Sequence, residues 1–300
     1  MKTEIIVNLT AGGGKPRPYL KTVFKYLEEN GFNFKVSYTS YHGEATELAQ
    51  KAADDGTDLI VSVGGDGTVN EIINGIMQSK NNPSLGIIPL GWANDFIKSV
   101  NIPSDITQAC KILAQGNTKE IDVGVINNKI YFGNICGIGF DAEVAQLANQ
   151  MKNRHPNWRV LSAFIYVFAT IKKLLTPFHC HKVKIKIDHQ EINSTMLFVA
   201  IGNGKIYGGR FKITPEAILD DGLLEVCLVG EMGRFKYLYL IPKVFAGAHK
   251  NIKGVNFYQA KEVTVESSEP IFAQVSGEVI EGQKNYTITL QPKRLKIIVP

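Results

Sequence analysis

The sequence predicts an α/β N-terminal domain, with a parallel sheet covered by helices on both faces, followed by a C-terminal domain rich in β-sandwich structure. Three observations predict this fold class. The chain has 300 residues, which is more than one compact domain usually holds. Up to about residue 120, apolar strand-like runs alternate with segments of helical periodicity, as in parallel sheets. After that point, short alternating segments separated by turn residues predominate, as in antiparallel sandwiches.

The elements of the first domain follow from apolar runs and helical spacing. Apolar runs that end at glycines or other turn residues predict strands at 4–9, 34–39, 59–63 and 86–90. Between them, apolar residues recur at helical spacing and predict helices at 19–29, 43–54, 69–78 and 106–114. Such alternation favours parallel strands joined by helical crossovers.

The pattern changes near Glu120. From there, period-two alternation predicts strands at 121–127, 129–135, 181–188, 191–201, 223–229, 262–266, 271–275 and 286–290. Helices are expected at 141–151, 157–175 and 235–245. We therefore place the first domain at 1–125 and the second at 126–290, and residues 290–300 are candidates for a return to the first domain.

Composition narrows the classes of function. The formal charge of +5 suits an anionic ligand or an anionic membrane surface and is too small to argue for a nucleic-acid partner. The four cysteines are scattered, which fits a reducing cytoplasm, and the first residues do not resemble a signal peptide. The most apolar window, 160–175, is interrupted by lysines and is shorter than the roughly 20 residues of a spanning helix. It is interpreted as a buried or interfacial helix.

The strongest motif is the run Gly64-Gly65-Asp66-Gly67-Thr68, which follows the predicted strand 59–63 and opens a helix. Glycines at such a turn let the backbone approach a phosphate closely. The helix N-terminus that follows offers free N–H groups to an anion. An aspartate here would repel a phosphate unless it acts through Mg²⁺ or its waters, whereas the threonine can cap the helix or bond a phosphate oxygen. The alternative is a glycine-rich turn with the aspartate as a cap.

The segment 59–68, LIVSVGGDGT, resembles the nucleotide-binding motif of the diacylglycerol kinase catalytic domain family. That family includes bacterial diacylglycerol kinases, sphingosine kinases and ceramide kinase. The same short motif is similar to those of NAD kinases and, more distantly, phosphofructokinases. The resemblance implies a phosphofructokinase/NAD-kinase-like first domain that binds ATP, but this motif alone does not name the acceptor.

Two further segments of the first domain support the resemblance. The run 8–15, NLTAGGGK, resembles the first-strand motif of the family and would bring Asn8 and Lys15 toward the phosphates. The run 91–96, GWANDF, is similar to the Gly-Thr-x-Asn-Asp-Phe motif of the lipid-kinase branch. It implies a place for Asn94 near ATP and makes Asp95 a second acidic group on the same sheet edge as Asp66.

The second domain carries one segment that implies a metal. Residues 202–210, 215–217 and 220–226 resemble the family's pattern of a Gly-Asn loop, a Pro-x-Ala and an Asp-Gly-x-Leu strand start. In bacterial members the last turn can hold a structural Mg²⁺. The resemblance implies that the side chain of Asp221 and the carbonyls of Leu223 and Ile218 would hold this ion. A type I′ turn at Asp-Gly is the alternative.

The last segment, 275–278 with sequence VSGE, resembles an Asp-Gly-Glu motif whose glutamate is the family's proposed general base. Glu278 would accept the proton of the lipid hydroxyl, because an alcohol is a poor nucleophile without such help. A surface hairpin glutamate is the alternative. Two residues depart from the family pattern: Ser276 stands for Asp and Trp92 for Thr.

The resemblance implies a kinase that uses ATP and Mg²⁺ to phosphorylate the hydroxyl of a lipid, diacylglycerol or a relative of it. Asp66, Asp95 and Glu278 would be its catalytic residues, with the lipid bound by the second domain. A soluble-acceptor kinase of the NAD-kinase type is the enzymatic alternative, and a weakly active nucleotide- or lipid-binding regulator is the other. We expect a cytoplasmic protein that contacts a membrane surface peripherally, with no nucleic-acid partner, and a homodimer is left open.

Overall fold

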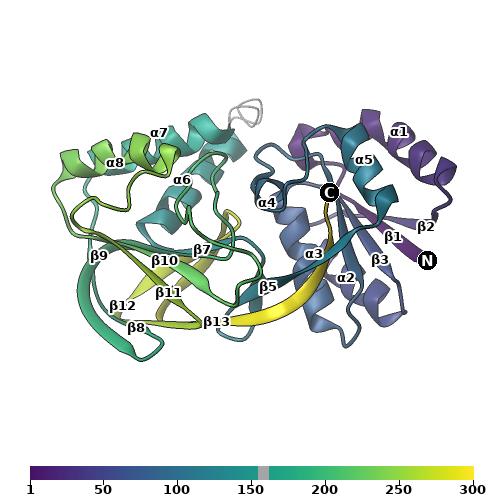
Figure 1. The fold of residues 1–300 in the computed structure, drawn as a ribbon. Coiled ribbons are helices and arrows are strands. Elements are labelled where there is room, and N and C mark those ends of the chain that lie inside the picture. Colours follow the sequence, from purple (N-terminus) through teal and green to yellow (C-terminus); the bar gives the residue numbers. More distant parts are fainter. Residues whose placement is uncertain (155–161) are drawn as a thin grey trace. The chain divides into compact units, whose positions relative to one another are not determined.

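The computed structural model describes residues 1–154 and 162–300 of the chain (Figure 1). The chain forms two compact units. The first contains residues 1–123 and 292–300, and the second contains residues 124–291.

The first unit is built on a parallel sheet. Its first four strands are β1 (Lys2–Val7), β2 (Asn33–Tyr38), β3 (Leu59–Gly64) and β4 (Ser84–Pro89). They lie in the order β2-β1-β3-β4, and every neighbouring pair is parallel. The end of the last strand of the chain adds a further parallel neighbour, because Ile297 pairs with Leu85 of β4. All six residues of β3 are buried, as expected for a central strand covered on both faces.

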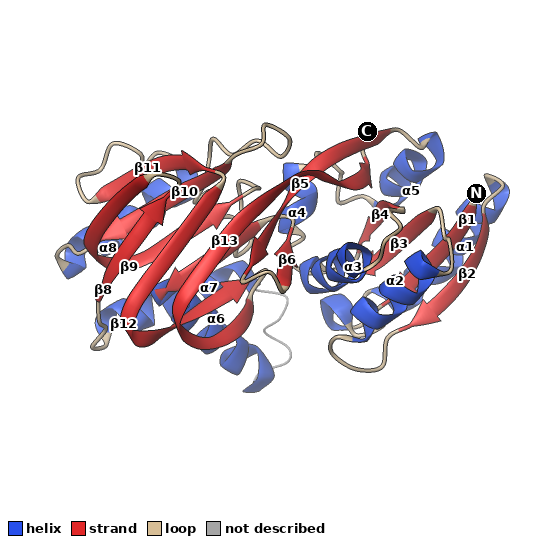
Figure 2. Cartoon of the chain, turned by 90° about the horizontal axis from the view of Figure 1, so that it is seen from below, coloured by secondary structure: helices blue, strands red, loops and turns tan. Residues whose placement is uncertain are grey.

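Five helices accompany this sheet in the described chain: α1 (Pro16–Glu29), α2 (Glu44–Asp54), α3 (Asp66–Gln78), α4 (Asp95–Ser99) and α5 (Ile106–Gln115). Helices α2 and α3 pack on each other on one side of the sheet, and α1 and α5 lie on the other (Figures 1 and 2). Close packing requires Gly75, because a Cβ there would lie 2.4 Å from the carbonyl oxygen of Thr46. Helix α3 begins at Asp66, three residues before the prediction, so this aspartate lies in its first turn.

The second unit is an antiparallel β-structure with helices. Its strands are β5 (Thr118–Ile126, which begins in the first unit), β6 (Ile130–Phe132), β7 (Ile135–Gly139), β8 (His181–Ile187), β9 (Gln190–Gly202), β10 (Leu224–Gly230), β11 (Val255–Ala260), β12 (Glu262–Val275) and β13 (Glu278–Ile298, which ends in the first unit). The main order is β11-β10-β9-β7-β12-β13, while β8 pairs with both β9 and β12 and β5 pairs with β6 and β13. Inward-facing Val, Ile and Leu side chains form one core between these strands.

Several strand predictions in this unit are wrong. The predicted strand 129–135 is two strands, β6 and β7, and the predicted strands 262–266 and 271–275 are one strand, β12, with an irregular register between Glu266 and Ile271. Strand β11 was not predicted. Strand β13 has 21 residues where 286–290 was expected, because the polar run EGQKN lacks alternation and is held in the sheet by its pairing with β12.

Three helices lie together on one side of this sheet: α6 (Phe140–Arg154), α7 (Ser162–Leu175) and α8 (Arg234–Ala246) (Figures 1 and 2). Their apolar faces and the facing side chains of β9 and β10 form a second core. The predicted helix 157–175 corresponds to α7, and its residues 157–161 lie outside the described residues. In the part of the chain that the structure describes, no helix has the length and apolar character needed to cross a membrane.

Candidate active site

In the first unit, the loops that follow β1, β3 and β4 meet at the carboxyl edge of the sheet. The three strands are neighbours and parallel, so their ends converge. Backbone hydrogen bonds fasten the loops: the N–H of Asn8 donates to the carbonyl of Val63 at 3.0 Å, and the N–H of Leu90 donates to that of Gly64 at 2.8 Å. The segments 8–15, 64–68 and 91–95 are therefore brought together, as an anion site between strand ends requires.

Glycines allow these loops to touch. A Cβ on Gly91 would lie 2.4 Å from the Cα of Gly65, and one on Gly64 would lie 2.6 Å from Oγ1 of Thr68. No side chain fits at either distance without displacement of the neighbouring backbone or helix. The Gly64–Thr68 turn is thus held in close contact with the neighbouring loop and with Thr68, which only glycine allows at these positions.

Asn8 connects the first loop to helix α3. Its Nδ2 donates to Oγ1 of Thr68 at 3.1 Å. Its Oδ1 accepts from both the N–H and the hydroxyl of Thr10, at 3.0 and 2.8 Å. The side chain of Asn8 is therefore used to orient the loop and Thr68.

Lys15 lies over the indole of Trp92. Its Nζ is 4.2 Å from the ring centroid and donates to the carbonyl of Gly91 at 3.4 Å. The ring also packs on the backbone of Gly13, where a Cβ would lie 3.0 Å from Cζ2 of Trp92. Trp92, which departs from the family motif, thus positions the lysine by a cation–π contact. Its buried Nε1 has no hydrogen-bond partner among the described residues.

Two carboxyl groups stand at the starts of α3 and α4. Oδ1 of Asp66 accepts from the N–H of Phe96 at 3.0 Å, and Oδ1 of Asp95 is 2.7 Å from Nζ of Lys98. Burial, with a further contribution from the charge of Asp95, raises the pKa of Asp66 to about 6 although backbone N–H groups and Lys98 oppose the shift. A divalent cation would relieve the repulsion between these two carboxyls, and oxygen ligands are those that Mg²⁺ prefers.

Asn94 holds the loop that carries Asp95. It has the left-handed backbone that Asn tolerates, with φ of 46°, and its Oδ1 accepts from the N–H of Gly91 at 3.0 Å. Its Nδ2 reaches the carbonyls of Gly91 and Pro89 at 3.3 and 3.4 Å. The observed contacts of Asn94 are therefore with its own loop.

In the second unit, Glu278 follows a two-residue turn between β12 and β13. Val275 pairs with Glu278, and Ser276 and Gly277 have positive φ values of 51° and 85°. Positive φ at both central residues is the type I′ hairpin geometry. Gln274 and Asn149 fasten the turn: Oε1 of Gln274 accepts from the N–H of Gly277 at 2.9 Å, and Nδ2 of Asn149 donates to its carbonyl at 2.8 Å. Glu278 is half-buried in this position.

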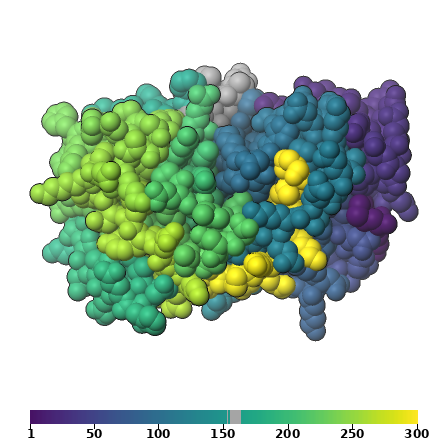
Figure 3. Space-filling model, in the orientation of Figure 1, coloured from purple at the N-terminus to yellow at the C-terminus, as the bar shows by residue number. Residues whose placement is uncertain are grey.

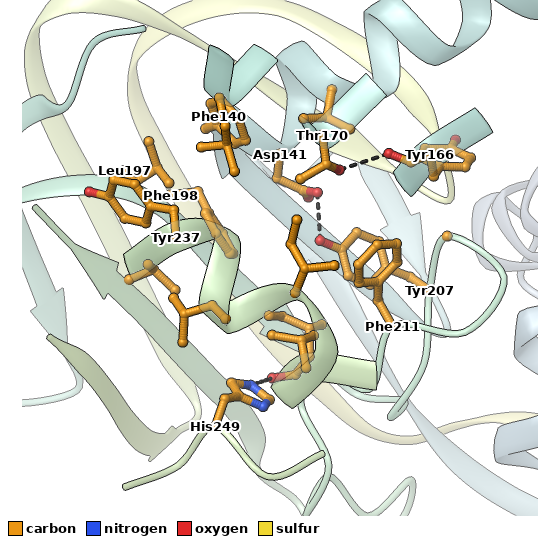
Figure 4. Close-up of a pocket in the computed structure, with 18 of the residues that line it drawn as sticks. Phe140, Asp141, Tyr166, Thr170, Leu197, Phe198, Tyr207, Phe211, Tyr237 and His249 are labelled. Atoms are coloured by element: carbon orange, nitrogen blue, oxygen red, sulfur yellow. Dashed lines mark hydrogen bonds between the residues drawn. The ribbon is translucent and has the colours of Figure 1, made fainter. Parts of the chain in front are cut away.

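Behind the hairpin lies a buried network centred on Asp141. Its Oδ1 accepts from the hydroxyl of Tyr207 at 2.6 Å (Figure 4). Its Oδ2 accepts from Nε2 of Gln274 at 2.8 Å. Burial raises the pKa of Asp141, and the two donors partly oppose this shift. A Cβ on Gly137 would lie 1.8 Å from Oδ2, so only glycine leaves room for the carboxylate. Through Gln274, this network supports the turn that precedes Glu278.

An apolar cavity lies between the helices α6, α7 and α8 and the strands beneath them (Figure 4). Its volume for water-sized molecules is about 80 Å³. Most of its wall is apolar and includes Phe140, Val144, Leu174, Leu197, Phe198, Phe211, Ile213, Val229, Leu240 and Val244. Its polar groups include Asp141, Tyr207 and the buried His249, whose Nε2 is 3.1 Å from the carbonyl oxygen of Ile213. An apolar cavity with few polar groups suits the hydrocarbon part of an amphipathic ligand.

The residues expected to hold a structural Mg²⁺ lie in one loop before β10. Oδ1 of Asp221 accepts from the N–H of Leu223 at 3.0 Å across Gly222, which has φ of 77°. The side chain of Ile218 is 51% exposed. In this structure the Asp221 carboxylate closes a local turn, and its role in holding a metal stays a prediction.

Sequence reasoning missed Asp141, Gln274, Tyr207 and His249. Asp141 had a usable signal: the run Gly137-Ile138-Gly139 ends a strand and Asp141 follows at the start of a helix, as Asp66 does after its glycines. Gln274 and Tyr207 had none, because nothing local marks them.

Comparison with known proteins agrees with this arrangement. Residues 2–126 match the family described as "Diacylglycerol kinase catalytic domain", and residues 134–299 match the "YegS C-terminal NAD kinase beta sandwich-like domain". The diacylglycerol kinase of Staphylococcus haemolyticus is 30% identical over 275 residues, covering 92% of this chain and 81% of the relative. That of Bacillus subtilis is 28% identical over 279 residues, covering 92% and 89%.

Solved structures give the same result. A crystal structure of a diacylglycerol kinase from Bacillus anthracis has a TM-score of 0.78 at 27% identity and covers 100% of this chain and 97% of that one. A second crystal structure from that organism has a TM-score of 0.83 at 28% identity, with the same coverage.

The catalytic-domain match over the convergent loops and the sandwich-like match over the second unit define a two-domain lipid kinase. The chain belongs to the diacylglycerol kinase family. The predicted resemblance, the two-domain layout and the lipid-kinase class are confirmed.

Proposed function

We propose that this lipid kinase transfers the γ-phosphate of ATP, with Mg²⁺, to the hydroxyl of diacylglycerol or a closely related lipid. The observation that carries the proposal is the convergence of three glycine-rich loops with Asp66 and Asp95 at one edge of a parallel sheet, in a chain of this family. We see no comparable observation in favour of an NAD-kinase-type kinase or of a weakly active regulator.

The phosphates of ATP would be bound by the N–H groups of the Gly64–Thr68 turn and the start of α3. Lys15 would add a positive charge, since among the described residues its ammonium contacts a carbonyl and a ring, both of which a phosphate can outcompete. Asn8, through Thr68, and Asn94, through its own loop, would keep these groups in place.

Asp66 and Asp95 would hold Mg²⁺, directly or through its waters. When bound, the ion supplies positive charge against the phosphate oxygens, which lowers the cost of the charge that develops in transfer. The raised pKa of Asp66 fits this role, because the site favours neutralisation of that carboxylate by a proton or a cation.

Glu278 would act as the general base. Transfer forms a bond from the lipid oxygen to the γ-phosphorus and breaks the bond from that phosphorus to the bridging oxygen of ADP. The hydroxyl proton passes to the Glu278 carboxylate. The hairpin geometry, with its bonds to Gln274 and Asn149, supports a fixed position for this side chain.

The acyl part of the lipid would enter the apolar cavity of the second unit. The cavity has a volume of about 80 Å³ for water-sized molecules, and its wall is mostly apolar. The buried Nδ1 of His249, without a hydrogen-bond partner among the described residues, would add one polar contact.

We further propose a structural Mg²⁺ held by Asp221 and the carbonyls of Leu223 and Ile218, which would brace the loop before β10. A lipid acceptor also implies peripheral contact with a membrane, and the four free cysteines favour the cytoplasm as the compartment. Assembly as a homodimer stays open.

The test of the acceptor is a transfer assay with ATP labelled at the γ-phosphate, Mg²⁺ and a panel of diacylglycerol, monoacylglycerol, a sphingoid base and NAD. We expect label to enter diacylglycerol or one of the other lipids and not NAD. Transfer to NAD alone would contradict the proposal, and ATP binding without any transfer would favour a regulator.

A further inference from the structure

Helices α7 and α8 expose large apolar side chains. On α7, Phe164, Phe168, Ile171 and Leu175 recur at steps of four, three and four residues, which places them on one face of the helix. Phe164 is 72% exposed. On α8, Phe235 and Tyr239 are one turn apart, and Phe235 is 85% exposed. We call these six residues the outer face.

The outer face is not needed to pack the helices on the unit. The opposite side of α7 is buried through Ile165, Ala169 and Leu174. The opposite side of α8 is buried through Leu240 and Val244, which line the apolar cavity. The two helices contact each other, and both reach the molecular surface (Figures 1 and 3). The two helices therefore cover the cavity, with apolar side chains both toward the cavity and toward solvent.

The charged residues of α7 and α8 are all basic. The described sequences of α7 and α8 contain Lys172, Lys173, Arg234, Lys236 and Lys243 and no Asp or Glu. One of these charges is compensated from α6, where Glu143 lies 2.9 Å from Nζ of Lys173.

The guanidinium of Arg234 connects the two helices. It donates to the carbonyl of Thr176, just after α7, at 3.4 Å and lies 5.6 Å from the ring centroid of Phe178. Arg234 therefore lies where the two helices meet, directly before Phe235 of the outer face.

We infer that the outer face of α7 and α8 docks onto the surface of an anionic lipid bilayer. Exposed apolar side chains on two adjacent helices whose charged residues are all basic are the pattern of an interfacial membrane contact. The phosphates of anionic lipids complement the basic side chains of these helices. The inference rests on the proposed function. A lipid acceptor in the bilayer could pass between the apolar bilayer and the apolar cavity beneath α7 and α8 without entering water.

The test is sedimentation of the full chain with vesicles of phosphatidylglycerol or of phosphatidylcholine. We expect binding to phosphatidylglycerol vesicles that weakens with salt. The variant Phe164→Ser/Phe168→Ser should bind roughly tenfold more weakly, because it removes inserted apolar area. The control Tyr19→Ser/Tyr38→Ser changes two exposed aromatic side chains in the first unit and should bind as the wild type does.

A second variant tests the charges. Lys172→Glu/Lys236→Glu should lose the preference for phosphatidylglycerol, whereas Lys21→Glu/Lys51→Glu, on α1 and α2, should keep it. Equal binding by wild type and both outer-face variants overturns the inference. So does a change from dimer to monomer in Phe164→Ser/Phe168→Ser without a change in vesicle binding, because the face would then be an interface between copies.

Activity toward a short-chain diacylglycerol in solution separates this inference from the proposed function. None of the substituted outer-face residues lines the cavity. We therefore expect Phe164→Ser/Phe168→Ser to retain this activity while it loses vesicle binding. A wild-type protein that binds vesicles without phosphorylating any lipid would refute the proposed function and leave the docking face standing.

Discussion

The carboxyl of Asp66 is held in a setting that opposes its ionisation. Burial and the charge of Asp95 raise its pKa from 3.8 to about 6. For an acid with a raised folded pKa, the folded state binds the proton more tightly than the unfolded state does. The resulting stabilisation is present below about pH 4, is lost as the pH rises toward about 6, and is absent above it.

This setting makes a prediction for Asp66→Asn. The amide cannot hold Mg²⁺ as the carboxylate would, so lipid phosphorylation should fall at least about a hundredfold. At pH 7 the variant should be more stable by on the order of 1 kcal/mol, a value reduced because water still reaches part of the Asp66 carboxyl. This gain should vanish near pH 4. Urea unfolding at the two pH values measures it, and a variant that is less stable at pH 7 would contradict the electrostatic account.

Tyr207 has a different role, since its hydroxyl satisfies one oxygen of the buried Asp141. Tyr207→Phe keeps the ring and removes the donor. A buried carboxylate that loses one hydrogen bond costs about 1–3 kcal/mol, so the free energy of unfolding should fall by that amount. Tyr38→Phe, on an exposed tyrosine, is the matched control and should cost nothing measurable. Equal stability of the two variants would show that the hydrogen bond from Tyr207 does not stabilise the buried Asp141.

These residues show what local sequence can reveal. Asp66 was predictable because the glycines, the preceding apolar strand and the following helix are adjacent in the chain. The bond from Gln274 to Asp141 joins residues 133 apart, and that from Tyr207 to Asp141 joins residues 66 apart. Only the folded sheet brings such partners together, so no local pattern marks them.

Among the elements, the hairpin before Glu278 carries an unfavourable residue. Ser276 has φ of 51° at the first position of a type I′ turn, where Asn, Asp and Gly are preferred. The serine that replaces the family's aspartate therefore affects backbone strain as well as charge.

Ser276→Asn should therefore stabilise the protein by about 0.5–1 kcal/mol, because Asn tolerates this conformation better than Ser does. The change is measured as a shift in the urea midpoint. Ser276→Val, a β-branched residue poorly suited to positive φ, should move the midpoint in the opposite direction. A loss of stability in the Asn variant would mean that this turn is not held in the type I′ conformation in solution.

The elements that the sequence predicted well are those with a regular pattern of apolar residues. Strand β3 is an unbroken apolar run and was located within one residue, at Leu59–Gly64. Helix α5 was also found, because its apolar residues recur at helical spacing, which is a local signal. Strand β13 was largely missed, since its polar residues are strand only because β12 pairs with them.

At the scale of the whole molecule, the first unit depends on the last residues of the chain. Leu295 and Ile297 are fully buried, and Ile297 pairs with Leu85 of β4. The N–H of Lys293 donates to Oδ1 of Asp122 at 2.7 Å. The end of β13 is thus a structural strand of the unit that carries the three glycine-rich loops.

Ile297→Ala should accordingly destabilise the first unit by about 2–5 kcal/mol, the usual cost of such a cavity. ATP binding should then be lost at a lower urea concentration than in the wild type. Ile218→Ala removes an isoleucine side chain that is 51% exposed and should shift neither quantity by more than about 0.5 kcal/mol. Unchanged stability in Ile297→Ala would contradict the assignment of this strand to the first unit.

The most direct test of the lipid-kinase mechanism compares phosphate transfer to diacylglycerol by the wild type, Glu278→Gln and Glu281→Gln. Glu281 lies on the same strand, is exposed and has the same side chain, so it controls for loss of charge in β13. If Glu278 is the general base, Glu278→Gln should lower kcat by about 10²–10⁴ with little change in ATP binding, and Glu281→Gln should retain wild-type activity. Wild-type kcat in Glu278→Gln, or an equal loss in both variants, would contradict the role assigned to Glu278.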